Sequence, residues 1–119
     1  MTDFEKKVYN TWLATTRSKN NKPFRLRKDW TSFEDRPEYL PLKKLANMFK
    51  RFDNIIINEW FEAPYEIYKQ DDTPNYDLRF YTSAKAFNCY KLHKTKFKNI
   101  TSQEFHRTLF KNKQTEKIS

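Results

Sequence analysis

The chain has 119 residues, the length of one domain, and carries 24 Lys and Arg against 15 Asp and Glu, for a net charge of +9. This surplus favours attraction to acidic partners, nucleic acid among them. Glycine is absent, which excludes the phosphate-binding loops and dinucleotide turns that need glycine for close backbone approach.

The mean hydropathy of −1.06 is that of a very polar chain, but 11 Phe, 7 Tyr and 3 Trp provide the bulk of a folded core. The single cysteine, Cys89, excludes an internal disulfide and the usual cysteine-based zinc sites. No apolar run approaches the length of a membrane span, and the first residues lack the layout of a signal peptide. We therefore expect a cytoplasmic protein without a cofactor or metal, with one domain over residues 1–112 and a flexible tail at 113–119.

The first predicted helix covers residues 2–16. Thr2 and Glu5 have the spacing of a capping box, and Phe4, Val8 and Trp12 recur on one face. The periodicity then stops, and residues 17–28 contain six cations and no acid. We expect this stretch to be an exposed basic arm.

Residues 29–39 are expected to be irregular or to form a helical turn around Trp30 and Phe33. A helix should follow from Pro41, a residue that the first helical turn tolerates, to Phe52. Residues 55–62 could form another helix, which Pro64 should end because proline lacks a backbone donor.

Residues 65–69 and 76–81 are rich in residues that favour strands, and a strong turn signal lies between them at residues 70–75. In the second stretch Tyr76, Leu78 and Phe80 alternate with polar neighbours, which predicts a β-hairpin. Thr82 or Ser83 could then cap a helix to about residue 97. Another capping box, Thr101 with Glu104, predicts a last helix.

These elements predict a compact α+β domain of about four helices and one β-hairpin. An all-α domain is the alternative if residues 65–69 are helical. The order of a helix at 41–52, a helix near 55–62 and a hairpin is that of a winged helix-turn-helix. The second helix, however, carries Glu59 and Glu62 and no cation, which disfavours its entry into a DNA groove.

The cations and acids are segregated along the chain, and two acid-free stretches, residues 17–28 and 78–103, carry most of the imbalance. Together they predict a phosphate-binding surface, with two aromatic rings available to stack on bases. Solvated lysines that contact nothing remain the alternative. The candidate nucleic-acid-binding residues are Arg17, Lys19, Lys22, Phe24, Arg25, Arg27, Lys28, Trp30, Lys85, Lys91, Lys94, Lys96 and Lys98.

Catalytic arrangements are disfavoured. Cys89 and His93 would share a helical face, but a buried thiol beside an ordinary histidine is the more frequent arrangement. Asp71, Asp72 and Asp77 could hold Mg²⁺, yet the first two lie in the predicted turn, where acids are favoured for local hydrogen bonds. The cluster of Tyr residues is expected to be cross-strand packing. We therefore predict a protein that is not an enzyme.

Residues 18–27 (SKNNKPFRLR) and 80–86 (FYTSAKA) resemble stretches in small uncharacterised proteins of AT-rich bacteriophages. The resemblance covers about a third of the chain and carries no catalytic motif. It implies a viral accessory protein that acts inside a bacterial host. Two functions remain open: a nucleic-acid-binding accessory protein in replication, recombination or transcription, and a module that binds an acidic host or viral protein, as a virion component or an inhibitor.

Overall fold

The computed structural model describes residues 1–19, 23–68 and 76–93, and these form four α-helices and two short 3-10 turns, without a strand among them. The prediction of an α+β fold is therefore wrong, and the all-α alternative fits. The predicted helix at Thr101 and the tail at 113–119 lie outside the described residues, as do Lys22, Lys94, Lys96 and Lys98. None of the described helices combines the length and the apolarity that a membrane-spanning helix requires.

Helix α1 covers Asp3–Lys19 and begins at the predicted capping box. The backbone N–H of Thr2 donates to Glu5 Oε1 at 2.8 Å, and the N–H of Glu5 donates to Thr2 Oγ1 at 3.1 Å. This reciprocal pair satisfies two of the donors that a helix leaves unpaired at its start. Val8 and Tyr9 are buried on the inner face of α1. The helix extends three residues beyond its predicted end, so Arg17 and Lys19 belong to α1 and not to an arm.

Helix α2 covers Tyr39–Arg51 and has the strongest apolar periodicity of the four described helices. Pro41 lies in the first turn, as predicted, and Leu42, Leu45 and Phe49 are buried on one face. The segment before α2 contains a 3-10 turn, Phe33–Asp35, whose first residue is fully buried. The predictions for this part of the chain are confirmed.

Helix α3 covers Ile57–Tyr68, and Pro64 lies inside it. The prediction that Pro64 ends the helix is wrong. A proline inside a helix costs about 3 kcal/mol, because a hydrogen bond is lost and the ring crowds the preceding turn. Here the first two turns carry large buried groups: Trp60, Phe61 and Pro64 are all fully enclosed. Burial of these side chains offsets the local penalty, so the helix continues through the stretch predicted to be the first strand.

The second predicted strand is also absent. Asp77 Oδ1 accepts the backbone N–H of Phe80 at 2.8 Å, and this local bond leads into a 3-10 turn, Phe80–Thr82. Short polar side chains offer the backbone such alternatives to a strand ladder. Leu78 and Tyr81 are both buried, so the expected alternation of faces does not hold. The aromatic residues that suggested a hairpin instead pack between a helix and a loop, with the rings of Tyr65 and Tyr76 5.0 Å apart.

Helix α4 covers Ala84–His93 within the described residues. It starts just after Ser83, as the sequence predicted. The Ser83 hydroxyl donates to the carbonyl of Phe80 in the preceding turn. Its apolar residues are spread around the axis, and four of them are buried: Ala86, Phe87, Cys89 and Tyr90.

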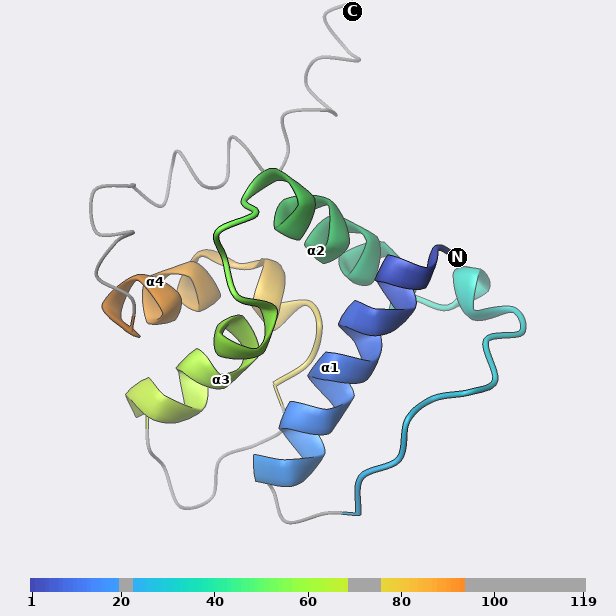
Figure 1. Cartoon of the computed structure of the whole chain (residues 1–119), viewed down its shortest axis with the longest axis horizontal. Helices are drawn as coiled ribbons and strands as arrows, with labels where there is room; N and C mark the ends of the chain where they lie inside the picture. The colour runs from blue at the N-terminus through green and yellow to red at the C-terminus, as the bar shows by residue number, and fades with distance from the viewer. Residues whose placement is uncertain (20–22, 69–75, 94–119) are drawn as a thin grey trace, which may run out of the picture.

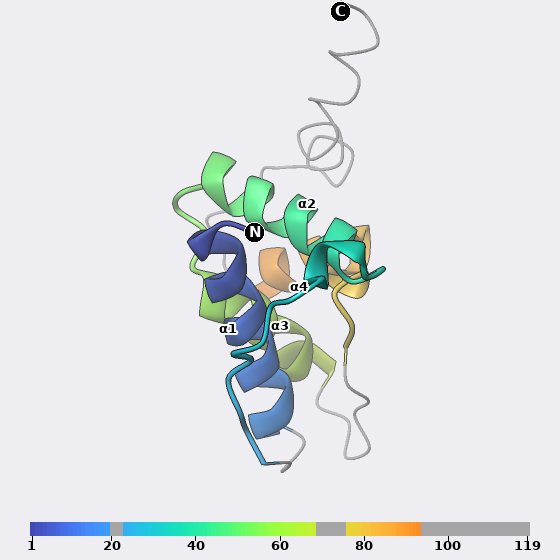
Figure 2. The same ribbon diagram turned by 90° about the vertical axis from the view of Figure 1, so that its right-hand side faces the viewer.

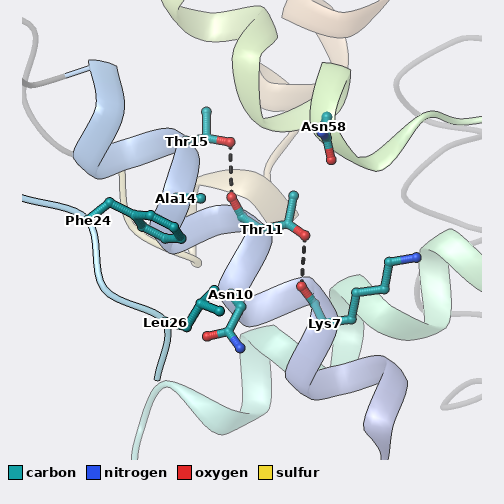
Figure 3. Close-up of a pocket in the computed structure, with 8 residues that line it drawn as sticks. All are labelled: Lys7, Asn10, Thr11, Ala14, Thr15, Phe24, Leu26 and Asn58. Carbon is teal, nitrogen blue, oxygen red and sulfur yellow. Dashed lines mark hydrogen bonds between the residues drawn. The ribbon is translucent and has the colours of Figure 1, made fainter. Parts of the chain in front are cut away.

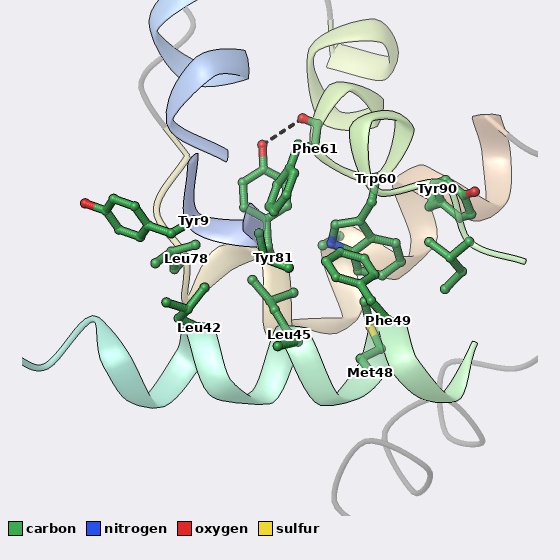
Figure 4. Close-up of a cluster of buried hydrophobic side chains, with 14 of the residues drawn as sticks. Tyr9, Leu42, Leu45, Met48, Phe49, Trp60, Phe61, Leu78, Tyr81 and Tyr90 are labelled. Carbon is green, nitrogen blue, oxygen red and sulfur yellow. Dashed lines mark hydrogen bonds between the residues drawn. The ribbon is translucent and has the colours of Figure 1, made fainter. Parts of the chain in front are cut away.

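Figure 1 shows how the helices surround the core: α3 packs between α1 and α4, and α2 crosses one end of all three. Figure 4 shows side chains of α2 directed into an aromatic cluster that α3, α4 and the 3-10 turn before α4 contribute. At its centre the rings of Phe61 and Tyr81 lie 4.8 Å apart, and the Tyr81 hydroxyl donates to the Phe61 carbonyl at 2.9 Å. Aromatic rings thus supply most of the core volume.

Candidate nucleic-acid interface

The predicted basic arm divides into a buried part and an exposed part. Residues 23–28 run beside α1 (Figures 1 and 2), and their backbone is attached to it where the N–H of Arg27 donates to Asn10 Oδ1 at 2.9 Å. Phe24, Arg25 and Lys28 are exposed, whereas Arg27 and Trp30 are half-buried. Only the first three therefore have the accessibility that contact with a nucleic acid needs.

Arg27 occupies an aromatic cage. Its guanidinium carbon lies 5.9 Å from the centre of the Tyr9 ring, 5.7 Å from Trp30 and 5.1 Å from Phe33. A guanidinium so enclosed is attracted by the negative faces of the rings and is withdrawn from solvent. The structure therefore gives Arg27 and Trp30 a role in packing, where the sequence had suggested phosphate contact and base stacking.

The cage is held by a hydrogen bond at its rim. The Tyr9 hydroxyl donates to Glu38 Oε2 at 3.1 Å. Burial raises the pKa of Tyr9, and the negative charge of Glu38 raises it further. The bond joins α1 to the residue that precedes α2, so the cage lies where three segments of the chain meet.

The described lysines of the second cation-rich stretch lie on the other side of the molecule. Lys85 is exposed and Lys91 is half-buried, both on α4, whereas the exposed Arg79 precedes α4 and lies near Pro37 and Pro41. Figure 1 shows α4 and residues 23–28 separated by α3 and α1, and the turned view in Figure 2 has residues 23–28 in front and α4 behind. The two stretches therefore do not form one surface over the described residues.

A basic surface that the sequence reading missed lies on α2. This helix contains no acid, and its cations all lie on the face opposite the core. Lys43, Lys50 and Arg51 are exposed, and Lys44 is half-buried. The signal was present in the sequence, because the spacings that place Leu42, Leu45 and Phe49 on the inner face place these cations outside. We call the set Lys43, Lys44, Lys50 and Arg51 the α2 cation face.

The α2 cation face continues onto the first turns of α1. The ammonium of Lys50 lies 5.5 Å from the centre of the Phe4 ring. Lys7 follows Phe4 by three residues, so the two share one side of α1, and Lys7 is exposed. Acids flank the face at its ends, with Asp53 after α2 and Glu34 before it. The amino group of Met1, and to a lesser extent Lys43, lower the pKa of Glu34.

A groove adjoins Lys7 on the outer side of α1. Its volume is about 380 Å³. Figure 3 shows its walls: Phe24 and Leu26 from the exposed segment on one side, α1 as the floor, and Asn58 of α3 across from them. Its lining contains one cation, two amides and two hydroxyls but no carboxylate: Lys7, Asn10, Thr11, Ala14, Thr15, Phe24, Leu26 and Asn58.

The described acidic residues between the two basic stretches are not among the residues that line this groove, although Glu59 and Glu62 lie on α3 with Asn58, which does. Glu59, Glu62 and Glu66 follow one another on α3 at spacings of three and four residues, which places them on one face of that helix. Glu59 and Glu62 are half-buried and Glu66 is exposed. Asp71 and Asp72 lie outside the described residues.

The catalytic cysteine weighed from the sequence lacks the geometry that it needs, whereas Asp71 and Asp72 of the Mg²⁺ arrangement lie outside the described residues. Cys89 is buried, and burial raises the pKa of its thiol, although a hydrogen bond with Tyr68 partly opposes this. A nucleophilic cysteine needs an exposed thiol with a lowered pKa. Within the described residues, no three His, Cys, Asp or Glu side chains lie close enough to hold a metal ion.

Comparison with protein-family models, with curated proteins and with solved structures found no match to this chain.

Proposed function

We propose that this protein is a non-enzymatic nucleic-acid-binding accessory protein that contacts phosphates through the α2 cation face and Lys7. The observation that carries the proposal is the segregation of charge on α2, whose outer side has three exposed cations and the half-buried Lys44 but no acid. Lys and Arg on one helix face are the electrostatic footprint of a protein that binds a phosphate backbone. The resemblance to bacteriophage proteins supports a role in the cytoplasm of a host cell.

The chain outside the described residues adds to the electrostatic attraction. Residues 94–119 contain seven Lys or Arg and two Glu, so they carry more than half of the net charge of +9. The range of the attraction at physiological salt is about 8 Å. The net charge speeds the encounter with a nucleic acid. Because the range is short, the contacts that set affinity must come from cations that touch phosphates.

The test compares two double variants with the same net charge. Lys43→Gln with Lys50→Gln removes two cations from the α2 cation face, and Lys28→Gln with Lys85→Gln removes two exposed cations elsewhere. Affinity for a labelled oligonucleotide is measured by fluorescence anisotropy at about 0.1 M salt. The first variant should weaken binding on the order of tenfold, since each lost phosphate contact also loses released counterions.

The control variant should weaken binding less than threefold, about the size of a general charge effect. Equal losses in the two variants would mean that only net charge matters and would overturn the α2 interface. A wild-type protein that binds neither single strands nor duplexes would overturn the function, and a module that binds an acidic protein would then be the remaining hypothesis.

A further inference from the structure

The groove beside α1 has the properties of a site for a flat polar ring. Most of its floor is one helix face, formed by residues at spacings of three and four along α1. Its volume of about 380 Å³ lies in the range of small-molecule sites. Figure 3 shows the Phe24 ring beside Ala14, with the Asn10 and Asn58 amides on either side of the floor.

Phe24 supplies the stacking surface. Its side chain is 46% exposed, although phenylalanine is among the residues most often buried. The segment that carries it is anchored three residues later, where Arg27 enters the aromatic cage and its backbone N–H bonds to Asn10. The backbone of this segment is thus attached to α1 next to the groove, which limits the ordering that ligand binding requires and favours affinity.

The polar groups of the lining suit the edge of a base. The hydroxyls of Thr11 and Thr15 donate to the α1 carbonyls of Lys7 and Thr11 at 2.8 and 3.0 Å, which leaves their oxygens as acceptors. The Asn10 amide, whose oxygen accepts the N–H of Arg27, offers its N–H donors, and the Asn58 amide carries donors and an acceptor. Such amides pair with base edges. Lys7 lies at the rim and joins the groove to the α2 cation face.

We propose that the groove accommodates an unstacked base of a single-stranded nucleic acid, stacked on Phe24, while the adjoining phosphates follow Lys7 toward α2. The proposal rests on the proposed function and adds a preference for single strands. In a duplex every base is paired and stacked, so its rings cannot reach such a groove without being extruded. Single-strand binding proteins combine a cationic track with aromatic stacking in this way.

The test is Phe24→Ala, measured by anisotropy with a labelled oligothymidine single strand and with a duplex of the same length at one salt concentration. Stacking losses of this kind are about five- to hundredfold per base. We expect a loss of that size for the single strand, less than a twofold change for the duplex, and recovery of most of the affinity in Phe24→Tyr. Leu92→Ala, which removes an exposed apolar side chain on α4, is the matched control and should change neither affinity.

Failure of this inference and failure of the proposed function give different results. Duplex and single-strand binding that Phe24→Ala leaves equally strong would overturn the base site and leave the α2 cation face standing. No binding of either nucleic acid by the wild-type protein would overturn both. Because Phe24 is half-exposed, the variant should keep the wild-type unfolding midpoint, and a shift of more than a few degrees would also contradict the inference by giving Phe24 a role in the core.

Discussion

Replacing Arg27 with alanine tests whether the aromatic cage stabilises the fold. Three rings lie within 5.1 to 5.9 Å of the guanidinium. A partly desolvated cation–π contact contributes about 2 kcal/mol, and contacts that share one cation do not add fully. With the packing of the aliphatic stem included, we expect Arg27→Ala to lower the free energy of unfolding by about 2–3 kcal/mol.

The matched control is Arg36→Ala. Arg36 also lies over Phe33, at 5.9 Å, but it is exposed and lies over one ring among the described residues, where Arg27 lies over three. Its removal should cost about 0.5 kcal/mol. Equilibrium unfolding in urea, followed by the fluorescence of the three tryptophans, measures both values. A loss in Arg27→Ala no larger than in Arg36→Ala would refute the cage as a stabilising element and would return Arg27 to the set of candidate phosphate contacts.

Four further measurements address the core and one helix cap. Tyr81 is buried, and burial raises its pKa. Since the folded state then holds the proton more tightly, the contribution of Tyr81 to stability should be constant below about pH 10 and be lost above it, so the alkaline loss of stability should be less steep in Tyr81→Phe. The same variant loses the bond to the Phe61 carbonyl and should be about 1 kcal/mol less stable at pH 7, whereas unchanged urea midpoints would contradict that bond. Cys89 should react with a thiol reagent only as fast as the protein opens, and rapid labelling of the native protein would show that its burial is wrong. Thr2→Ala should cost about 1 kcal/mol by loss of its bond to the N–H of Glu5, and an unchanged midpoint would exclude the cap.

The elements that the sequence predicted well depend on interactions between near neighbours. The capping box of α1 needs only Thr2 and Glu5, and the inner face of α2 needs only residues three and four apart. Pro41 is compatible with the first turn of α2 because proline lacks an N–H, and N–H groups in the first turn have no partner within the helix. Each of these signals involves only residues within one or two helical turns, so it can be recognised from the sequence alone.

The predictions that were wrong concern segments whose structure depends on contacts between residues distant in the sequence. Residues 65–68 have strand-forming side chains, yet they are helical because α3 packs against both α1 and α4. The ring of Tyr76 completes this packing from a segment that lies eleven residues beyond Tyr65. Local propensity differs by about 1 kcal/mol between residues, which burial of such rings exceeds. No local pattern could show which partners would meet.

The candidate site likewise has a part that could be predicted from the sequence and a part that could not. Arg25 and Arg27 look alike in the sequence, and only the meeting of Tyr9, Trp30 and Phe33 distinguishes the buried cation from the exposed one. The α2 cation face, by contrast, could be predicted, because the helix was predicted and its outer positions follow from its inner ones. The cations of the α2 cation face do not form one continuous run in the sequence. A prediction based on runs of cations therefore missed them.

The salt dependence of binding tests the central claim most directly. Five cations, the α2 cation face with Lys7, should release counterions so that the logarithm of the association constant for a single strand falls against the logarithm of salt concentration with a slope of about −3.5. Removal of two of them in Lys43→Gln with Lys50→Gln should bring the slope to about −2. A wild-type slope near zero, or a slope that this double variant leaves unchanged, would contradict the account.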